Sequence, residues 1–282
     1  MSLTVLAAGV QTTVQDRGRL GFAHLGVPRA GALDAPAAAL ANRLVGNDPG
    51  AAVLEVTLGG LRVRTDVGTW IAVTGAEAPV RLGGRPAAHT RAEWLPAGAC
   101  LELGPPTTGV RSYVAVAGGI AVDPVLGSRS TDTLAGLGPA QVADGDVLPV
   151  GPPTGAGPVG LDTPPRRRAD GLRVHPGPRP EWFGPDALDR LCAGEWRVLP
   201  ASNRVGLRVS GVPLPRVEGE LSSEGMVLGA VQVPPDGQPV VFLHDHPTTG
   251  GYPVVAVVDP ADLWQCAQLR PGEAVSFRRA TG

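Results

Sequence analysis

The chain has 282 residues, of which 43% are hydrophobic and 18% are charged, and its formal net charge at pH 7 is -2. This composition is typical of a globular protein, and it lacks the clustered basic surface that binding to nucleic acid or to an anionic membrane requires, so we expect neither partner. All 24 basic residues are arginine, so the chain itself cannot supply the lysine amine of a Walker-type phosphate loop, a Schiff base or an attached biotin.

The first half of the chain predicts short strands and one helix. With 40 glycines and 30 prolines, the composition favours strands joined by tight turns, so we expect a mainly β protein. Apolar or alternating runs bounded by glycine and proline predict strands at 54–64, 69–75, 99–104 and 112–122. Residues 34–47 begin with a capping aspartate, have proline in the first turn and end at Gly-Asn, which predicts a helix.

A segment rich in proline and glycine, residues 149–171, has no periodic apolar face and is typical of a linker or an exposed excursion. A chain of this length is past the size at which one core grows comfortably. We therefore expect domains at 1–150 and 172–282, joined by a linker at 151–171. The second domain again predicts short strands, with short helices at 259–269 and near residue 184.

Two pairs of segments echo one another across this boundary. Residues 19–28 and 204–213 share an arginine, a glycine and a Gly-Val-Pro at the same spacing. Residues 95–103 and 269–277 share a leucine, a glycine and a following apolar strand. The echoes predict a duplicated fold.

Polar side chains gather within residues 11–34. Asp16 and Arg19 follow a short expected strand, and Asp34 follows a glycine-rich loop. An arginine fork can bind a carboxylate through two hydrogen bonds, so this region is a candidate anion site. The structural alternative is an Asp16–Arg19 turn pair together with a helix cap at Asp34.

A second polar run, GSRSTD at 127–132, lies between turn signals. Arg129 and its neighbours could bind an anion there. Alternatively, the run could be a surface loop held by its own side-chain hydrogen bonds.

The loop HDHPTTGGYP at 244–253 collects hydroxyls, imidazoles and a carboxylate. One interpretation is a hairpin in which the paired glycines supply positive φ and Tyr252 packs on a neighbour. The other is a donor site for a carboxylate, phosphate or oxyanion, with Asp245 positioning a partner or accepting a proton. The candidate donors are the backbone N–H groups and hydroxyls of Thr248, Thr249, Gly250 and Gly251.

The two histidines of this loop are expected on a strand and so on one face, as a metal pair would be. The other three histidines, His24, His89 and His175, offer no companion motif, so we expect no metal site and assign His246 to hydrogen bonding or protonation. Gln232 is expected mid-strand between valines, where a buried amide needs a partner, and a ligand could be that partner.

The sequence has no recognisable motif for a catalytic nucleophile. The chain has no G-x-S-x-G elbow, and its three cysteines are far apart in sequence, without the spacing of a zinc site or the density of a disulfide scaffold. These cysteines fit a reducing cytoplasm, and no stretch approaches the roughly 18 apolar residues of a membrane span, so we expect a cytoplasmic protein. On its motifs alone, the chain is an incomplete enzyme.

Several long motifs occur in order between about residue 4 and residue 277. They are QTTVQDRGRLGFAHLGVPRAGALD, ANRLVGN, LEVTLGG, YVAVAGGI, GSRSTDTLAGLG, SNRVGLRVSG, GAVQVPPDG, DHPTTGGYP and AQLRPGEAVSF. Together they resemble the allophanate hydrolase subunit 2 family, which includes the C subunit of 5-oxoprolinase, the regulator KipA and half of the carboxyltransferase domain of urea carboxylase. Pro247 departs from the glutamine of many members.

The resemblance implies two cyclophilin-like β-barrel domains with a few short helices. It implies an obligate partner, the B subunit, which is KipI-like and belongs to the allophanate hydrolase subunit 1 family. The pair would work with the A subunit in a bacterial ATP-dependent 5-oxoprolinase, active only in complex. The B–C pair would activate the lactam by phosphorylation, and the A subunit would complete its hydrolysis to glutamate. ATP would bind at a site shared with the B subunit, if it contacts this chain, and any biotin would arrive on another polypeptide.

We place the substrate cleft of this hypothesis at residues from both halves of the chain. The catalytic candidates are Asp16, Asp245 and Thr249. The binding candidates are Arg19, Asp34, Arg129, Arg204, Gln232, His246, Thr248, Gly250, Gly251 and Tyr252. Two alternatives stay open: a biotin-dependent carboxyltransferase half acting on a small amide such as urea, and a non-catalytic KipA-like regulator that binds a kinase inhibitor.

Overall fold

The structure, a computed structural model, describes residues 1–155, 157–160 and 171–280, which group into two compact units. The first unit contains residues 1–19 and 30–132 and the described residues from 136 to 160. The second contains residues 20–29, 133–135 and 171–280, so two short segments of the N-terminal half belong with the C-terminal strands. The expected assignment to two cyclophilin-like domains at 1–150 and 172–282 stays a prediction.

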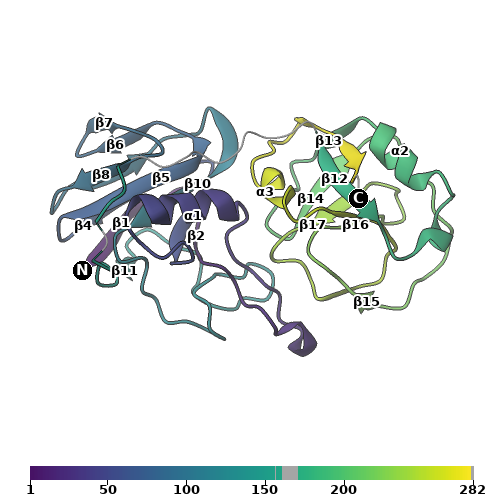
Figure 1. Cartoon of the computed structure of the whole chain (residues 1–282), viewed down its shortest axis with the longest axis horizontal. Coiled ribbons are helices and arrows are strands. Elements are labelled where there is room, and N and C mark those ends of the chain that lie inside the picture. Colours follow the sequence, from purple (N-terminus) through teal and green to yellow (C-terminus); the bar gives the residue numbers. More distant parts are fainter. Residues whose placement is uncertain (156, 161–170, 281–282) are drawn as a thin grey trace. The chain divides into compact units, whose positions relative to one another are not determined.

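The first unit is built on two antiparallel sheets (Figure 1). The six-stranded sheet has the order β11-β1-β4-β9-β6-β7, and the five-stranded sheet has the order β2-β3-β10-β5-β8. The strands of the first sheet are β1 (Ser2–Ala8), β4 (Leu61–Thr65), β6 (Val80–Leu82), β7 (Arg85–Ala87), β9 (Cys100–Leu103) and β11 (Val147–Pro149). Those of the second are β2 (Gln11–Gln15), β3 (Val53–Thr57), β5 (Thr69–Glu77), β8 (Ala92–Leu95) and β10 (Thr108–Val116).

The core of this unit lies between the sheets. It takes Leu3 and Val5 from β1 and Leu54 and Val56 from β3, so the sheets face each other as a sandwich. The strands alternate as a sheet with one buried face requires; the residues of β4, Leu-Arg-Val-Arg-Thr, are buried and exposed in turn.

Helix α1 (Ala35–Leu44) covers the other face of the five-stranded sheet (Figure 1). Its buried side chains, among them Ala37 and Leu40, pack against Ala72 of β5 and Tyr113 of β10. The helix predicted at 34–47 is therefore confirmed. Two described residues of the expected linker are attached to its end, since Thr154 Oγ1 donates to Gly46 O at 2.6 Å and Val159 N donates to Leu44 O at 2.9 Å. Residues 156 and 161–170 of that linker lie outside the described residues.

The second unit has an eight-stranded sheet of order β20-β13-β14-β17-β16-β19-β12-β21. Its strands are β12 (Leu172–Pro176), β13 (Trp196–Val198), β14 (Gly206–Ser210), β16 (Ala230–Gln232), β17 (Val240–Phe242), β19 (Val254–Val258), β20 (Ala274–Val275) and β21 (Phe277–Arg279). The two edge strands, β20 and β21, are separated only by Ser276 in the chain. Both edges can meet at one residue only if the sheet curls almost into a closed barrel. A smaller ribbon pairs β15 (Glu224–Gly225) with β18 (Thr249–Gly250).

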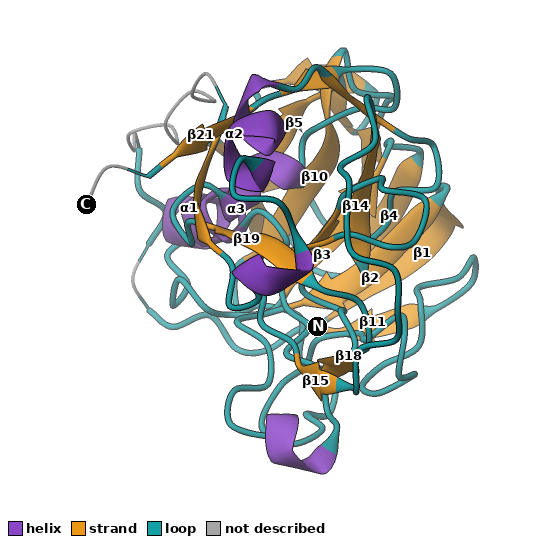
Figure 2. Cartoon of the chain, turned by 90° about the vertical axis from the view of Figure 1, so that its right-hand side faces the viewer, coloured by secondary structure: helices purple, strands orange, loops and turns teal. Residues whose placement is uncertain are grey.

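Helices are few and short in the described residues, as Figure 2 shows, which confirms the mainly β class. Besides α1 they are α2 (Ala187–Ala193), α3 (Leu263–Cys266) and the 3-10 helices η1 (Ala23–Leu25) and η2 (Pro180–Trp182). None of the described helices is long and apolar enough to cross a membrane. The helix predicted at 259–269 is wrong in length. Its start is a turn, because the Asp259 carboxylate accepts from Ala261 N and the Asp262 carboxylate binds Arg173.

One of the two sequence echoes is a shared turn. Gly98 and Gly272 both have positive φ, +75° and +85°, and each follows a leucine by three residues. Gly98 N donates to Thr65 O at 2.9 Å in the first unit, and Gly272 N donates to Val198 O at 2.8 Å in the second. The other echo, between residues 19–28 and 204–213, does not correspond to a shared backbone conformation. Residues 206–210 form strand β14, whereas residues 23–25 form the 3-10 helix η1.

Candidate functional site

Asp16, a predicted catalytic residue, anchors the polar loop at 127–132, which lies beside it in the fold. Its carboxylate accepts hydrogen bonds from the Ser128 and Ser130 hydroxyls, both at 2.6 Å, and from the backbone N–H groups of Arg129 at 2.6 Å and Gly18 at 2.8 Å. Burial raises the pKa of Asp16, but these four hydrogen bonds together outweigh burial and hold the pKa below its usual value. The GSRSTD run is thus a loop held by side-chain and backbone hydrogen bonds to the half-buried Asp16 carboxylate.

The other candidates of the first unit also have structural contacts. Arg19 is buried, and its guanidinium donates to the backbone carbonyl oxygens of Val125 and Ser130. The Arg129 side chain donates from Nε to Val122 O at 2.7 Å. Asp34 caps α1, since its Oδ1 accepts from Ala37 N at 3.0 Å, as the structural alternative predicted.

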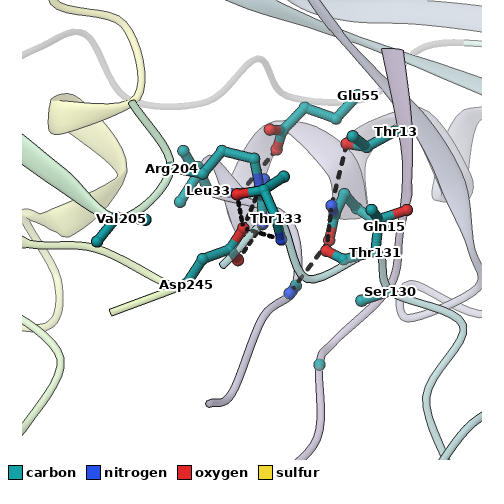
Figure 3. A network of polar contacts seen from close by, with 12 residues as sticks. Thr13, Gln15, Leu33, Glu55, Ser130, Thr131, Thr133, Arg204, Val205 and Asp245 are labelled. Carbon is teal, nitrogen blue, oxygen red and sulfur yellow. Dashed lines mark hydrogen bonds and ion pairs between the residues drawn. The ribbon is translucent and has the colours of Figure 1, made fainter. Parts of the chain in front are cut away.

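Gln15 ties the polar loop to strand β2. Its Nε2 donates to Thr13 Oγ1 and to Thr131 O, both at 3.0 Å, and its Oε1 accepts from Gly31 N at 3.1 Å (Figure 3). The buried amide is therefore satisfied on both ends, and it ties the backbone of Thr131 to that of Gly31.

In the second unit, Arg204 and Asp245 form a buried ion pair (Figure 3). Arg204 Nε and Nη2 donate to the two Asp245 oxygens, each at 2.9 Å, and the exposed fractions of the two side chains are 1% and 0%. Thr133 adds two donors to Asp245 Oδ2, its N–H at 3.0 Å and its hydroxyl at 2.7 Å. Burial raises the pKa of Asp245, but the Arg204 charge and these hydrogen bonds hold it below its usual value. Asp245 is thus an ionised anchor within its own unit.

The loop at 244–253 is not a hairpin, and that interpretation is wrong. Strands β17 and β19 flank the loop, but β16 lies between them in the sheet. Gly250 and Gly251 are not in the left-handed region either. Instead Thr249 and Gly250 form β18, which pairs with β15, and Met226 N donates to Thr248 O at 2.9 Å.

Gln232 fastens this ribbon from the sheet. Its side chain is 6% exposed, and its Nε2 donates to Tyr252 O at 3.0 Å. A Cβ added at Gly250 would lie 2.8 Å from the same nitrogen, so this close approach explains the glycine. The partner that a buried Gln232 was expected to need is a backbone carbonyl. Thr249 and Tyr252 are exposed, and Thr248 and Gly251 are half-buried.

The two histidines lie at a turn and not on a strand, because β17 ends at Phe242 and His246 N donates to Leu243 O at 3.1 Å. The His246 ring stacks on Phe242 with centroids 5.8 Å apart, and its Nδ1 lies 2.7 Å from Pro247 O. Within the described part of the chain, no group of three or more His, Cys, Asp or Glu side chains is arranged to hold a metal ion.

The family model for the carboxyltransferase domain, subdomain A and B, matches residues 25–279. The chain belongs to this family. The resemblance seen in the sequence motifs is therefore confirmed.

Three relatives show how far the similarity of this carboxyltransferase-domain chain extends. It is 41% identical to the C subunit of 5-oxoprolinase from Escherichia coli strain K12 over 98% of this chain and 90% of that protein. The protein in the crystal structure of TTHA0988 is 40% identical in sequence to this chain. The two structures have a TM-score of 0.90, and the alignment spans 98% of this chain and 56% of the solved chain. The crystal structure of Kluyveromyces lactis urea carboxylase is 30% identical with a TM-score of 0.92, over 99% of this chain and 27% of the solved chain.

The sequence interpretation of this carboxyltransferase-domain protein missed Thr133. Thr133 binds Asp245 from 112 residues away in the chain, so no local pattern reveals it. The prediction that candidates from both halves line one cleft stays a prediction.

Proposed function

We propose that the chain is the C subunit of an ATP-dependent 5-oxoprolinase complex, which opens the lactam of 5-oxoproline to glutamate. The observation that carries this proposal is the 41% identity to the Escherichia coli 5-oxoprolinase protein, which extends over 98% of this chain and 90% of that relative. The match to Kluyveromyces lactis urea carboxylase covers 27% of the solved chain, so it supports a shared domain more than a shared overall activity.

In this proposal the chain contributes a binding surface and depends on its partner proteins for the rest of the chemistry. ATP binds with the help of the B subunit, since this chain has no lysine for a Walker-type phosphate loop. The B–C pair activates the lactam carbonyl, and the A subunit then hydrolyses it. The internal anchoring of Asp16 and Asp245 supports positioning roles for both carboxylates, because each already accepts four hydrogen bonds. Thr249 then remains the exposed hydroxyl that is a candidate for direct contact with substrate.

The test is reconstitution of the complex from its purified components. We expect ATP-dependent glutamate release only when this chain and both of its partners are present. Thr249→Ala should reduce the rate about tenfold or more if the hydroxyl contacts the reacting lactam. Thr108→Ala, at an exposed threonine in the first unit, is the matched control. Release that proceeds without this chain would reject the assignment, and an unchanged Thr249→Ala rate would remove that residue from the site.

The alternative function is a carboxyltransferase half that acts on urea or a similar small amide. A specific observation favours it: the TM-score of 0.92 to Kluyveromyces lactis urea carboxylase over 99% of this chain. Incubation of the complex with carboxybiotin and urea tests it directly. Carboxylation of urea without any glutamate release from 5-oxoproline would replace the first proposal with this one.

A further inference from the structure

Two side chains of the second unit contain buried nitrogen atoms without a hydrogen-bond partner among the described residues. They are Nε of Arg29 and Nδ1 of His244, and no other buried side-chain polar atom in the described part of this unit is left in that condition. His244 is 7% exposed. Buried polar groups in folded proteins almost always have a partner, so two such atoms in one unit point to a ligand.

The two residues belong to segments that approach one another within the second unit. His244 precedes Asp245, in the turn that Leu243 and His246 close by a backbone hydrogen bond. Arg29 ends the segment 20–29, which packs near the same loop, since a Cβ added at Gly26 would lie 4.0 Å from Thr248 Oγ1. The Arg29 charge is also close enough to His244 to lower the pKa of the imidazole.

The charges around these two nitrogen atoms favour a ligand that carries one negative charge. The Arg204 charge is balanced by Asp245, with which it forms the bidentate pair. Burial, followed by the Arg204 and Arg29 charges, lowers the pKa of His244 to about 3, so the imidazole is neutral at physiological pH. The remaining cation of this group is Arg29. A neutral imidazole beside one arginine suits a small monoanion with two acceptor oxygens, which describes a carboxylate.

We propose that Arg29 and His244 bind the carboxylate of the substrate, with Arg29 Nε–H and His244 Nδ1–H as the two donors. The identification of that carboxylate with 5-oxoproline rests on the proposed function, whereas the anion site itself does not. The site differs from the predicted cleft, in which neither residue was included, and it uses donors that no internal carboxylate occupies.

The experiment follows the histidine ring signals of the full chain, in complex with its partner proteins, by ¹⁵N-resolved NMR at constant ionic strength. Three probes are added in turn: 5-oxoproline, acetate and 2-pyrrolidinone, which is the same lactam without the carboxylate. We expect 5-oxoproline and acetate to shift the His244 signals in a saturable way and 2-pyrrolidinone to leave them unchanged. The ring of His175, which lies 3.3 Å from Asp259 with a half-exposed side chain, is the internal reference.

Matched variants complete the test. Arg29→Gln should weaken binding of 5-oxoproline about tenfold or more, as expected for the loss of one charge-assisted hydrogen bond. Arg208→Gln, at an exposed arginine of β14 in the same unit, should bind as the wild type does. Thermal melting of both variants confirms that they are folded.

The outcomes separate the two proposals. Saturable His244 shifts with acetate but no glutamate release in the reconstituted complex would preserve the anion site and reject the 5-oxoprolinase function. Absence of a His244 shift with both carboxylates, an equal shift with 2-pyrrolidinone, or unchanged affinity in Arg29→Gln would overturn the anion site.

Discussion

Among single residues, the buried Arg204–Asp245 pair has the largest expected effect on stability. Each partner is almost fully buried, so removal of one charge leaves the other without compensation. We expect Asp245→Asn to lower the free energy of unfolding of the second unit by about 3–5 kcal/mol. Thr133→Val, which removes a hydroxyl donor but keeps the backbone N–H, should cost about 1 kcal/mol.

Urea denaturation of both variants, fitted with separate transitions for the two units, measures these losses. The double variant Arg204→Met/Asp245→Leu should recover part of the loss, because no unpaired charge then remains buried. If Asp245→Asn is as stable as the wild type and only activity is lost, Asp245 is a catalytic group and not an anchor.

The buried imidazole of His244 makes the stability of the second unit depend on pH. Its pKa is about 3 in the folded chain against 6.5 for an ordinary histidine, so the unfolded state binds the proton more readily. The full contribution to stability is therefore present above pH 6.5, and it decreases as pH falls toward 3, by at most about 1.4 kcal/mol per pH unit. Burial lowers the pKa of His89 as well, so part of the slope has a second source.

Urea denaturation between pH 6.5 and about 5 separates the histidine contributions from those of Asp16 and Asp245, whose pKa values lie below the usual aspartate value. His244→Phe should have a shallower slope than the wild type. Equal slopes in the wild type and His244→Phe would contradict the assignment of a neutral, buried imidazole.

At the scale of elements, the β15–β18 ribbon depends on a glycine that the sheet approaches closely. A Cβ at Gly250 would lie 2.8 Å from Gln232 Nε2 and 3.1 Å from Met226 Cγ. Gly250→Ala should therefore displace Gln232 and destabilise the ribbon by about 1–3 kcal/mol. Gly225→Ala, on the paired strand with no atom within 4 Å of the new Cβ, should change stability by less than about 0.5 kcal/mol.

Hydrogen exchange of the Met226 amide, which donates to Thr248 O, reports on the ribbon directly. Faster exchange is expected in Gly250→Ala and unchanged exchange in Gly225→Ala. The reverse order would mean that the packing of Gly250 does not hold the ribbon.

The arrangement of elements explains which local predictions were correct. Helix α1 was predictable because its signals are local: Asp34 at the cap, proline in the first turn and Gly46 at the end. The expected helix at 259–269 had a similar start, but Asp262 binds Arg173 from 89 residues away, and the helix shortens to four residues. The hairpin failed for a related reason, since the position of β16 between β17 and β19 is decided by sheet order.

At the scale of the whole molecule, dependence on biotin carried by a partner separates the two proposed activities. Biotin cannot be attached to this chain, so a carboxyltransferase reaction would depend on biotin carried by a partner. We expect avidin to leave ATP-dependent glutamate release by the reconstituted complex unchanged. Under the alternative, avidin should abolish carboxylation of urea. Glutamate release that avidin inhibits would contradict the 5-oxoprolinase proposal as stated.

The sequence by itself determined the mainly β class, the first helix, the family and the absence of any lysine chemistry, because composition, turn residues and ordered motifs are read along the chain. The tertiary structure alone decided what the polar residues do. Asp16 meets Ser128 and Ser130, and Asp245 meets Arg204 and Thr133, over separations of 41 to 114 residues. A carboxylate withdrawn from water must find its donors wherever the fold brings them, so the same pattern that predicted anion binding is largely satisfied internally. Among the described residues of the second unit, the buried side-chain nitrogens left without a hydrogen-bond partner are at Arg29 and His244.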